Sequence, residues 1–123
     1  MPREIRIPGP DHPISIVPST DHVLVRSGGQ TIADSQSTLM LLEANYPPVR
    51  YVPLPDVDQS LLASSNTHTY CPYKGEASYY SISADAERGA DAVWYYDQPH
   101  EAVAAIQNHV AFYEDRVDIE VKR

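Results

Sequence analysis

Proline divides this chain of 123 residues into short segments. Eleven prolines are spread between residues 2 and 99, and each one fixes its own φ angle and lacks a backbone N–H. Between them, apolar residues alternate with polar ones over short runs rich in β-branched and aromatic side chains, as at residues 49–52 and 117–121. This alternation is typical of short β-strands. We therefore predict a folded, mainly β protein.

The prolines also indicate how the chain is organised. Five of them fall within residues 1–19, which predicts an extended N-terminal arm with a short strand-like segment at Ile14 and Ile16. The remaining length suits one hydrophobic core, so residues 20–123 are predicted to form a single domain.

The spacing of apolar and turn-forming residues predicts the elements of this domain. A hairpin is expected over residues 22–33, because Gly28 and Gly29 suit a tight turn with positive φ. Residues 39–44 are predicted as a strand, 49–52 as a short edge or barrel-rim strand, and 92–96 as a central strand. A second hairpin is expected over residues 67–82. Pro99 suits the first position of a short helix over residues 99–108, and residues 110–121 are predicted to close the chain as a third hairpin.

Charge and cysteine content exclude several classes of partner. The chain has 17 acidic and 9 basic residues, a net charge of −8, which repels nucleic acids and anionic lipid surfaces. No run approaches the ~20 apolar residues that cross a membrane. Cys71 is the only cysteine, so no internal disulfide forms, and a cytoplasmic location is expected. We predict no metal site and no cofactor, because ligand spacing and a glycine-rich phosphate loop are both lacking.

The densest cluster of reactive residue types surrounds Cys71. A thiolate is the nucleophilic form of cysteine, and a nearby cation lowers the pKa of the thiol. Lys74 and His68 each lie three residues away, so Cys71 and Lys74 are candidate catalytic residues. The alternative is that Cys71 is a small buried apolar residue without reactivity.

Candidate ligand-binding residues come from other parts of the chain. Glu43 ends an apolar run, so its carboxylate is expected to face inward, either as an acid or base or in an ion pair with Arg50 or Lys74. The chain has nine tyrosines, and aromatic rings with hydroxyl groups can line a ligand pocket. We predict a ligand-binding set made of Glu43, Tyr51, His68, Tyr80 and Trp94.

The segment Thr69–Tyr80, which reads TYCPYKGEASYY, carries a family resemblance. Together with Pro10–Ile14, Gly28-Gly29, Pro47-Pro48 and His109–Val117, it resembles the domain-of-unknown-function family catalogued as four-two-seven (DUF427), which is sometimes labelled nucleotidyltransferase-like. The resemblance implies a β-tent fold, similar to the Mss-four-like proteins, in which antiparallel sheets lean together over a cleft. Some β-tent relatives hold zinc between paired Cys-x-x-Cys turns, whereas this chain has a single cysteine.

Three functional hypotheses follow. The first is a small-molecule-binding domain with a cleft near the turn at residues 70–75. The second is a thiol-dependent enzyme that uses Cys71. The third is a structural or interaction domain that forms a homo-oligomer through an exposed strand or an aromatic patch.

Overall fold

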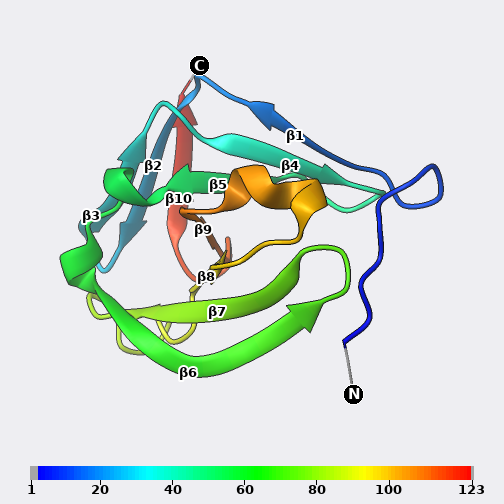
Figure 1. Cartoon of the computed structure of the whole chain (residues 1–123). Helices are drawn as coiled ribbons and strands as arrows, with labels where there is room; N and C mark the ends of the chain where they lie inside the picture. The colour runs from blue at the N-terminus through cyan, green and yellow to red at the C-terminus, as the bar shows by residue number, and fades with distance from the viewer. Residues whose placement is uncertain (1–2, 123) are drawn as a thin grey trace.

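The computed structural model describes residues 3–122, and these residues form two β-sheets (Figure 1). Among them are ten strands: β1 (Ile14–Pro18), β2 (His22–Ser27), β3 (Gln30–Ser35), β4 (Leu39–Glu43), β5 (Val49–Pro53), β6 (Leu62–Cys71), β7 (Gly75–Ile82), β8 (Val93–Tyr96), β9 (His109–Phe112) and β10 (Asp118–Lys122). Three 3-10 turns connect them: η1 (Leu54–Asp56), η2 (Gln59–Leu61) and η3 (Glu101–Ile106).

Both sheets are antiparallel. The larger sheet has seven strands in the order β1-β4-β5-β9-β8-β7-β6, and the smaller has three in the order β10-β2-β3. In Figure 1 the large sheet curls from β1 and β4 round to β6 and β7, while the small sheet stands at one side of it. The prediction of a mainly β protein is confirmed. The finer β-tent assignment stays a prediction.

The large sheet buries side chains on both faces. On β8, Val93 and Tyr95 join a core shared with the small sheet, while Trp94 and Tyr96 join a second core. Successive side chains of a strand point to opposite faces, so these cores lie on opposite sides of the sheet. The turn η3 contributes its buried side chains to the second core. This explains why no polar position interrupts the sequence of β8.

Several predicted elements are confirmed. The hairpin of β2 and β3 turns at Gly28 and Gly29, whose φ angles are 57° and 78°. The hairpin of β6 and β7 turns between Cys71 and Gly75, and β8 lies between β7 and β9 as a central strand. The strand-like segment at Ile14 and Ile16 is β1, which forms the edge of the large sheet beside β4.

The predicted helix at residues 99–108 is wrong in type. The structure has only the 3-10 turn η3 there, interrupted at Val103, whose φ and ψ are −125° and 26°. Val103 and Ile106 are buried, whereas Ala102 is exposed. The three-residue spacing of Val103 and Ile106 matches the period of a 3-10 helix, so both side chains can be buried without the longer apolar face of an α-helix. Within residues 3–122, no helix has the length and apolar character needed to cross a membrane.

Two predictions about strand pairing are also wrong. β5 is an interior strand between β4 and β9, not an edge strand. β9 and β10 do not form a hairpin, because β9 pairs with β5 and β8 while β10 joins β2 in the small sheet. In the small sheet, Ile119 and Val121 of β10 lie opposite Val25 and Val23 of β2, so the apolar side chains of the two strands share one face.

The N-terminal arm, described from residue 3, passes beside the turn between β6 and β7 (Figure 1). The backbone N–H of Arg6 donates to the carbonyl of Pro72 at 2.9 Å. Arg3 pairs with Glu76 at 2.7 Å, and its guanidinium lies over the ring of Tyr70. The arm therefore covers the segment that carries Cys71 and Lys74.

Candidate functional site

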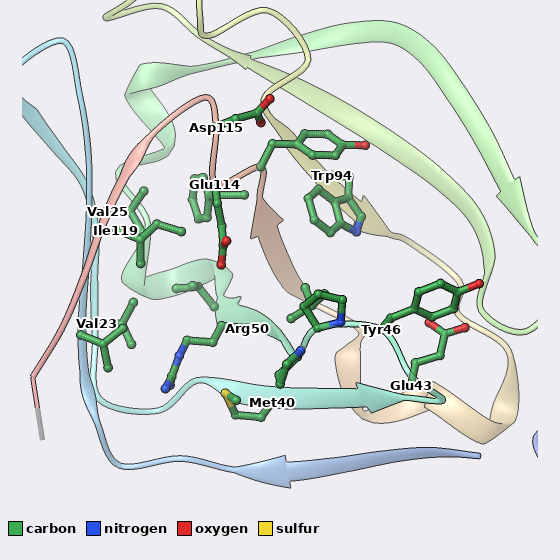
Figure 2. A pocket seen from close by; sticks show the side chains of 17 residues that line it. Val23, Val25, Met40, Glu43, Tyr46, Arg50, Trp94, Glu114, Asp115 and Ile119 are labelled. Carbon is green, nitrogen blue, oxygen red and sulfur yellow. The ribbon is translucent and has the colours of Figure 1, made fainter. Parts of the chain in front are cut away.

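A cavity of about 590 Å³ lies between the large and small sheets. Valines and an isoleucine from β2 and β10 form one wall, and Figure 2 shows Val23, Val25 and Ile119 on that side with Trp94 opposite them. The complete lining is Val23, Val25, Met40, Glu43, Tyr46, Pro47, Pro48, Val49, Arg50, Val52, Trp94, Phe112, Tyr113, Glu114, Asp115, Ile119 and Val121.

The cavity opens where β5 and β9 separate. These strands pair only through Val52 with Val110 and Pro53 with His109. In the same antiparallel register the next partners would be Tyr51 with Ala111 and then Arg50 with Phe112. Arg50 and Phe112 line the cavity instead of pairing. The two strands thus form a wedge within the large sheet. Pro47 and Pro48, which lead into β5, lie in the wall of this wedge and lack the N–H groups that would continue a ladder.

Glu43, at the end of β4, is held by two basic side chains. Lys74 Nζ lies 2.5 Å from one carboxylate oxygen, and His12 Nε2 lies 2.7 Å from the other. The ring of His12 stacks on Tyr73, with 4.0 Å between centroids. Because a carboxylate only accepts hydrogen bonds, both nitrogens donate to it. The arm, β4 and the β6–β7 turn therefore meet at this carboxylate.

The pKa of Glu43 reflects two opposing effects. Burial acts to raise it, because the side chain is only 12% exposed. The hydrogen bonds and charges of Lys74 and His12 outweigh burial, so the pKa of Glu43 lies below its ordinary value. Glu43 is therefore ionised at neutral pH and forms an ion pair with Lys74, which is one of the two interpretations that the sequence allowed. Its pKa is shifted away from the range of a general acid.

Trp94 joins this cluster to the buried tyrosines. Its indole N–H donates to the hydroxyl of Tyr51 at 3.3 Å. Burial raises the pKa of Tyr51 and of Tyr96 well above the ordinary value for tyrosine, and the negative charge of Glu43 adds to the effect. Cys71 itself is half-buried and packs against the same core. The side chain of Cys71 therefore packs in the same core as Tyr51 and Tyr96, outside the lining of the cavity.

Tyr113 continues the aromatic wall beyond Trp94. Its ring centroid lies 4.5 Å from that of Trp94, with the rings tilted by 43°. Its hydroxyl lies 3.5 Å from that of Tyr79. Burial, followed by this hydrogen bond, raises the pKa of Tyr113 to about 12. The Tyr113 hydroxyl therefore stays neutral at physiological pH and can donate or accept a hydrogen bond.

The structure brings together five of the seven predicted site residues. Glu43 and Trp94 line the cavity. Lys74 contacts Glu43, Tyr51 contacts Trp94, and Cys71 packs in the same core.

His68 and Tyr80 lie outside this cluster. His68 is exposed near Ser78, and it alternates with Thr69 and Cys71, so it points to the other face of β6. Tyr80 stacks on Tyr95 with 4.7 Å between centroids and packs against the other core. The residue that reaches the site from β7 is the neighbouring Tyr79.

Sequence reasoning missed His12, Tyr46 and Tyr113. His12 is 31 residues from Glu43 in the chain, and nothing in its neighbourhood of prolines indicates a carboxylate partner. The sequence around Tyr46 and Tyr113 does not distinguish them from the other seven tyrosines. The two prolines that follow Tyr46 were the one available signal, because they mark a break in strand pairing.

The remaining charged groups of the lining are one arginine and two carboxylates. Arg50 forms an ion pair with Asp21 at 3.1 Å and donates hydrogen bonds to the hydroxyls of Ser19 and Thr38. It does not pair with Glu43. Glu114 and Asp115 are exposed and make no ion pair with any residue in the range 3–122. Over the same range, no group of three or more His, Cys, Asp or Glu is placed to hold a metal ion.

Comparison with protein families gives one finding. A family model described as "Domain of unknown function (DUF427)" matches residues 15–123. The match includes every strand of the cavity wall and the Cys71–Lys74 turn, but not His12. A search of curated proteins finds no match.

Proposed function

This chain belongs to the DUF427 family of unknown function, and on that premise we propose that it binds a small molecule in the cavity between its two sheets. The single observation that carries the proposal is the cavity itself. Its volume of about 590 Å³ falls inside the range of roughly 300–1,000 Å³ that is usual for ligand sites.

The chemistry of the lining supports this function. Most of the wall is aliphatic or aromatic, with a few polar groups at the Glu43 and Asp115 ends. Ligand sites typically combine an apolar wall with a small number of oriented polar groups. Glu43 is already oriented by Lys74 and His12, so a ligand that contacts this carboxylate would not have to order it first.

The thiol-enzyme hypothesis has less support. A cation that activates the thiol has to lie next to it. The Lys74 ammonium instead forms an ion pair with Glu43 at 2.5 Å, and His68 lies on the other face of β6. A nucleotide is also a poor fit, because the lining has three carboxylates and one guanidinium that is already paired. Homo-oligomer formation stays a prediction.

A neutral apolar probe tests the proposal. N-phenyl-1-naphthylamine can be titrated into ¹⁵N-labelled protein while amide chemical shifts are followed. We expect saturable changes confined to β2, β5, β9, β10 and the segment around Trp94. No saturation at sub-millimolar probe, or changes confined to other surfaces, would remove the proposal.

A matched pair of variants locates the binding. Val121 lines the cavity and is 41% exposed, whereas Val17 on β1 is 43% exposed and does not line it. Val121→Asn should weaken probe binding by about three- to fivefold, since it removes part of the apolar wall. Val17→Asn makes the same chemical change at equal exposure and should leave the affinity unchanged. Equal losses in both variants would place the probe elsewhere.

A further inference from the structure

We propose that the ligand of this cavity is an organic cation, an ammonium compound with an apolar aryl or alkyl body. This inference rests on the proposed function and adds the chemical class of the ligand. The cationic end would lie at the mouth formed by Trp94, Tyr113, Glu114 and Asp115, and the apolar body would lie along the valine wall of β2 and β10.

The aromatic rings at the mouth are arranged to receive a cation. Trp94 and Tyr113 both line the cavity, and their tilted rings lie 4.5 Å apart, so together they form a corner rather than a closed stack. Tyr46, which is 63% exposed, lines the same space from the β4–β5 connection. The faces of such rings carry negative electrostatic potential and attract ammonium groups, with indole the strongest.

Among residues 3–122, the charged groups of the lining that have no ion-pair partner are all acidic. The lining contains Glu43, Glu114, Asp115 and one arginine, Arg50. Arg50 is neutralised by Asp21, and Glu43 by Lys74. Within residues 3–122 this leaves the carboxylates of Glu114 and Asp115 without an ion-pair partner. A cationic ligand would be attracted to this mouth, and an anionic ligand would be repelled.

The opposite wall suits an apolar body. Val23, Val25, Ile119 and Val121 present aliphatic side chains to the cavity. Figure 2 shows Val23, Val25 and Ile119 at one side of the pocket and Trp94 at the other, with Glu114 projecting between them in this view. A ligand that spans the cavity would therefore need two ends of different chemistry, one apolar and one charged.

Three probes of nearly equal shape test the charge preference: 4-phenylbutylamine, 4-phenylbutanol and 4-phenylbutanoate. Binding can be followed by the fluorescence of Trp94, the only tryptophan, and checked by calorimetry at neutral pH. We expect the amine to bind about tenfold more tightly than the alcohol, from a cation–π contact together with two nearby carboxylates. The acid should bind most weakly. An alcohol or acid that binds as tightly as the amine would overturn the inference.

Paired double variants assign the preference to the mouth. Glu114→Gln with Asp115→Asn should reduce the preference for the amine to about threefold or less, while the alcohol binds as before. Asp118→Asn with Glu120→Gln removes the same two charges from β10, at positions that alternate with the lining residues Ile119 and Val121. This control should keep the tenfold preference. A control that lowers it equally would show an effect of net charge alone, against the inference.

The outcomes separate this inference from the proposed function. Binding of N-phenyl-1-naphthylamine and 4-phenylbutanol in the cavity, without any preference for the amine, overturns only the organic-cation assignment. Failure of all the probes to bind overturns the proposed function, and the assignment falls with it.

Discussion

Replacing Glu43 with glutamine should destabilise the protein through the loss of a mostly buried ion pair. Glutamine keeps the shape of the side chain but removes the charge that faces Lys74 at 2.5 Å. The two side chains are 12% and 13% exposed, so Lys74 would keep its charge with little water to solvate it. Removing one partner of a fully buried pair costs roughly 3–5 kcal/mol, and at this partial exposure we expect about 2 kcal/mol.

Urea denaturation and thermal melting measure this loss. For a chain of this length, about 2 kcal/mol corresponds to a fall in Tm of roughly 6–8 °C. Glu76→Gln is the matched control, because Glu76 pairs with Arg3 at 2.7 Å but both side chains are at least half exposed. An exposed pair of this kind contributes about 0.5 kcal/mol or less. Equal stability of the two variants would refute the reasoning.

The pH dependence provides an independent check. The pKa of Glu43 is lower in the folded chain than its ordinary value of 4.5, so folding favours the ionised form. The stability from the charged pair is therefore fully present above pH 4.5 and is lost as the pH falls through the lower folded value. The difference in unfolding free energy between wild type and Glu43→Gln should shrink below pH 4.5. A difference that stays constant down to pH 2 would contradict this account.

Three further predictions concern the β2–β3 turn, the aromatic wall and the thiol. Gly28→Ala should lower the free energy of unfolding, measured by urea denaturation, by about 3 kcal/mol or more, because a Cβ there meets the Ala84 carbonyl oxygen at 2.3 Å. Gly29→Ala is the control: its Cβ enters open space, so it should lower the free energy of unfolding only by the backbone strain of about 1 kcal/mol. Absorbance titration should reveal a phenol that ionises near pH 12 and is lost in Tyr113→Phe; its ionisation near pH 10 would count against the burial argument. Iodoacetamide should label Cys71 several-fold more slowly in the folded than in the urea-unfolded protein, because the thiol is half-buried; equal rates would favour the thiol-enzyme hypothesis again.

Local patterns in the sequence were sufficient for most of the strands and for two of the three hairpins, although β6 begins at Leu62, five residues before the predicted hairpin. The turn at Gly28 and Gly29 requires positive φ, which glycine adopts without a steric penalty, so its position could be read directly. The predicted helix failed because an apolar spacing of three residues at Val103 and Ile106 is shared by the 3-10 and α periods. Short elements are the hardest to assign, since too few turns exist to separate the two periods.

The candidate site was predictable only in part, because a shift of one position along a strand moves a side chain to the opposite face of the sheet. Glu43 and Trp94 line the cavity, and both carried a local signal, since an acid that ends an apolar run and an aromatic in a central strand tend to face inward. Tyr80 is the predicted ligand-binding residue on β7, but its neighbour Tyr79 is the one that reaches Tyr113, whereas Tyr80 stacks on Tyr95. Both positions are tyrosine, so the alternation of side chains alone did not identify the inner face of β7.

The sequence by itself determined the mainly β character, the positions of most strands, and the impossibility of an internal disulfide, because these depend on residue types and on spacing over a few neighbours. The tertiary structure decided which strands pair, that β5 and β9 separate to open the cavity, and that His12 reaches Glu43. Those contacts join residues far apart in the chain. Their stability depends on surfaces that exist only after the sheets have assembled, and local periodicity carries no information about them.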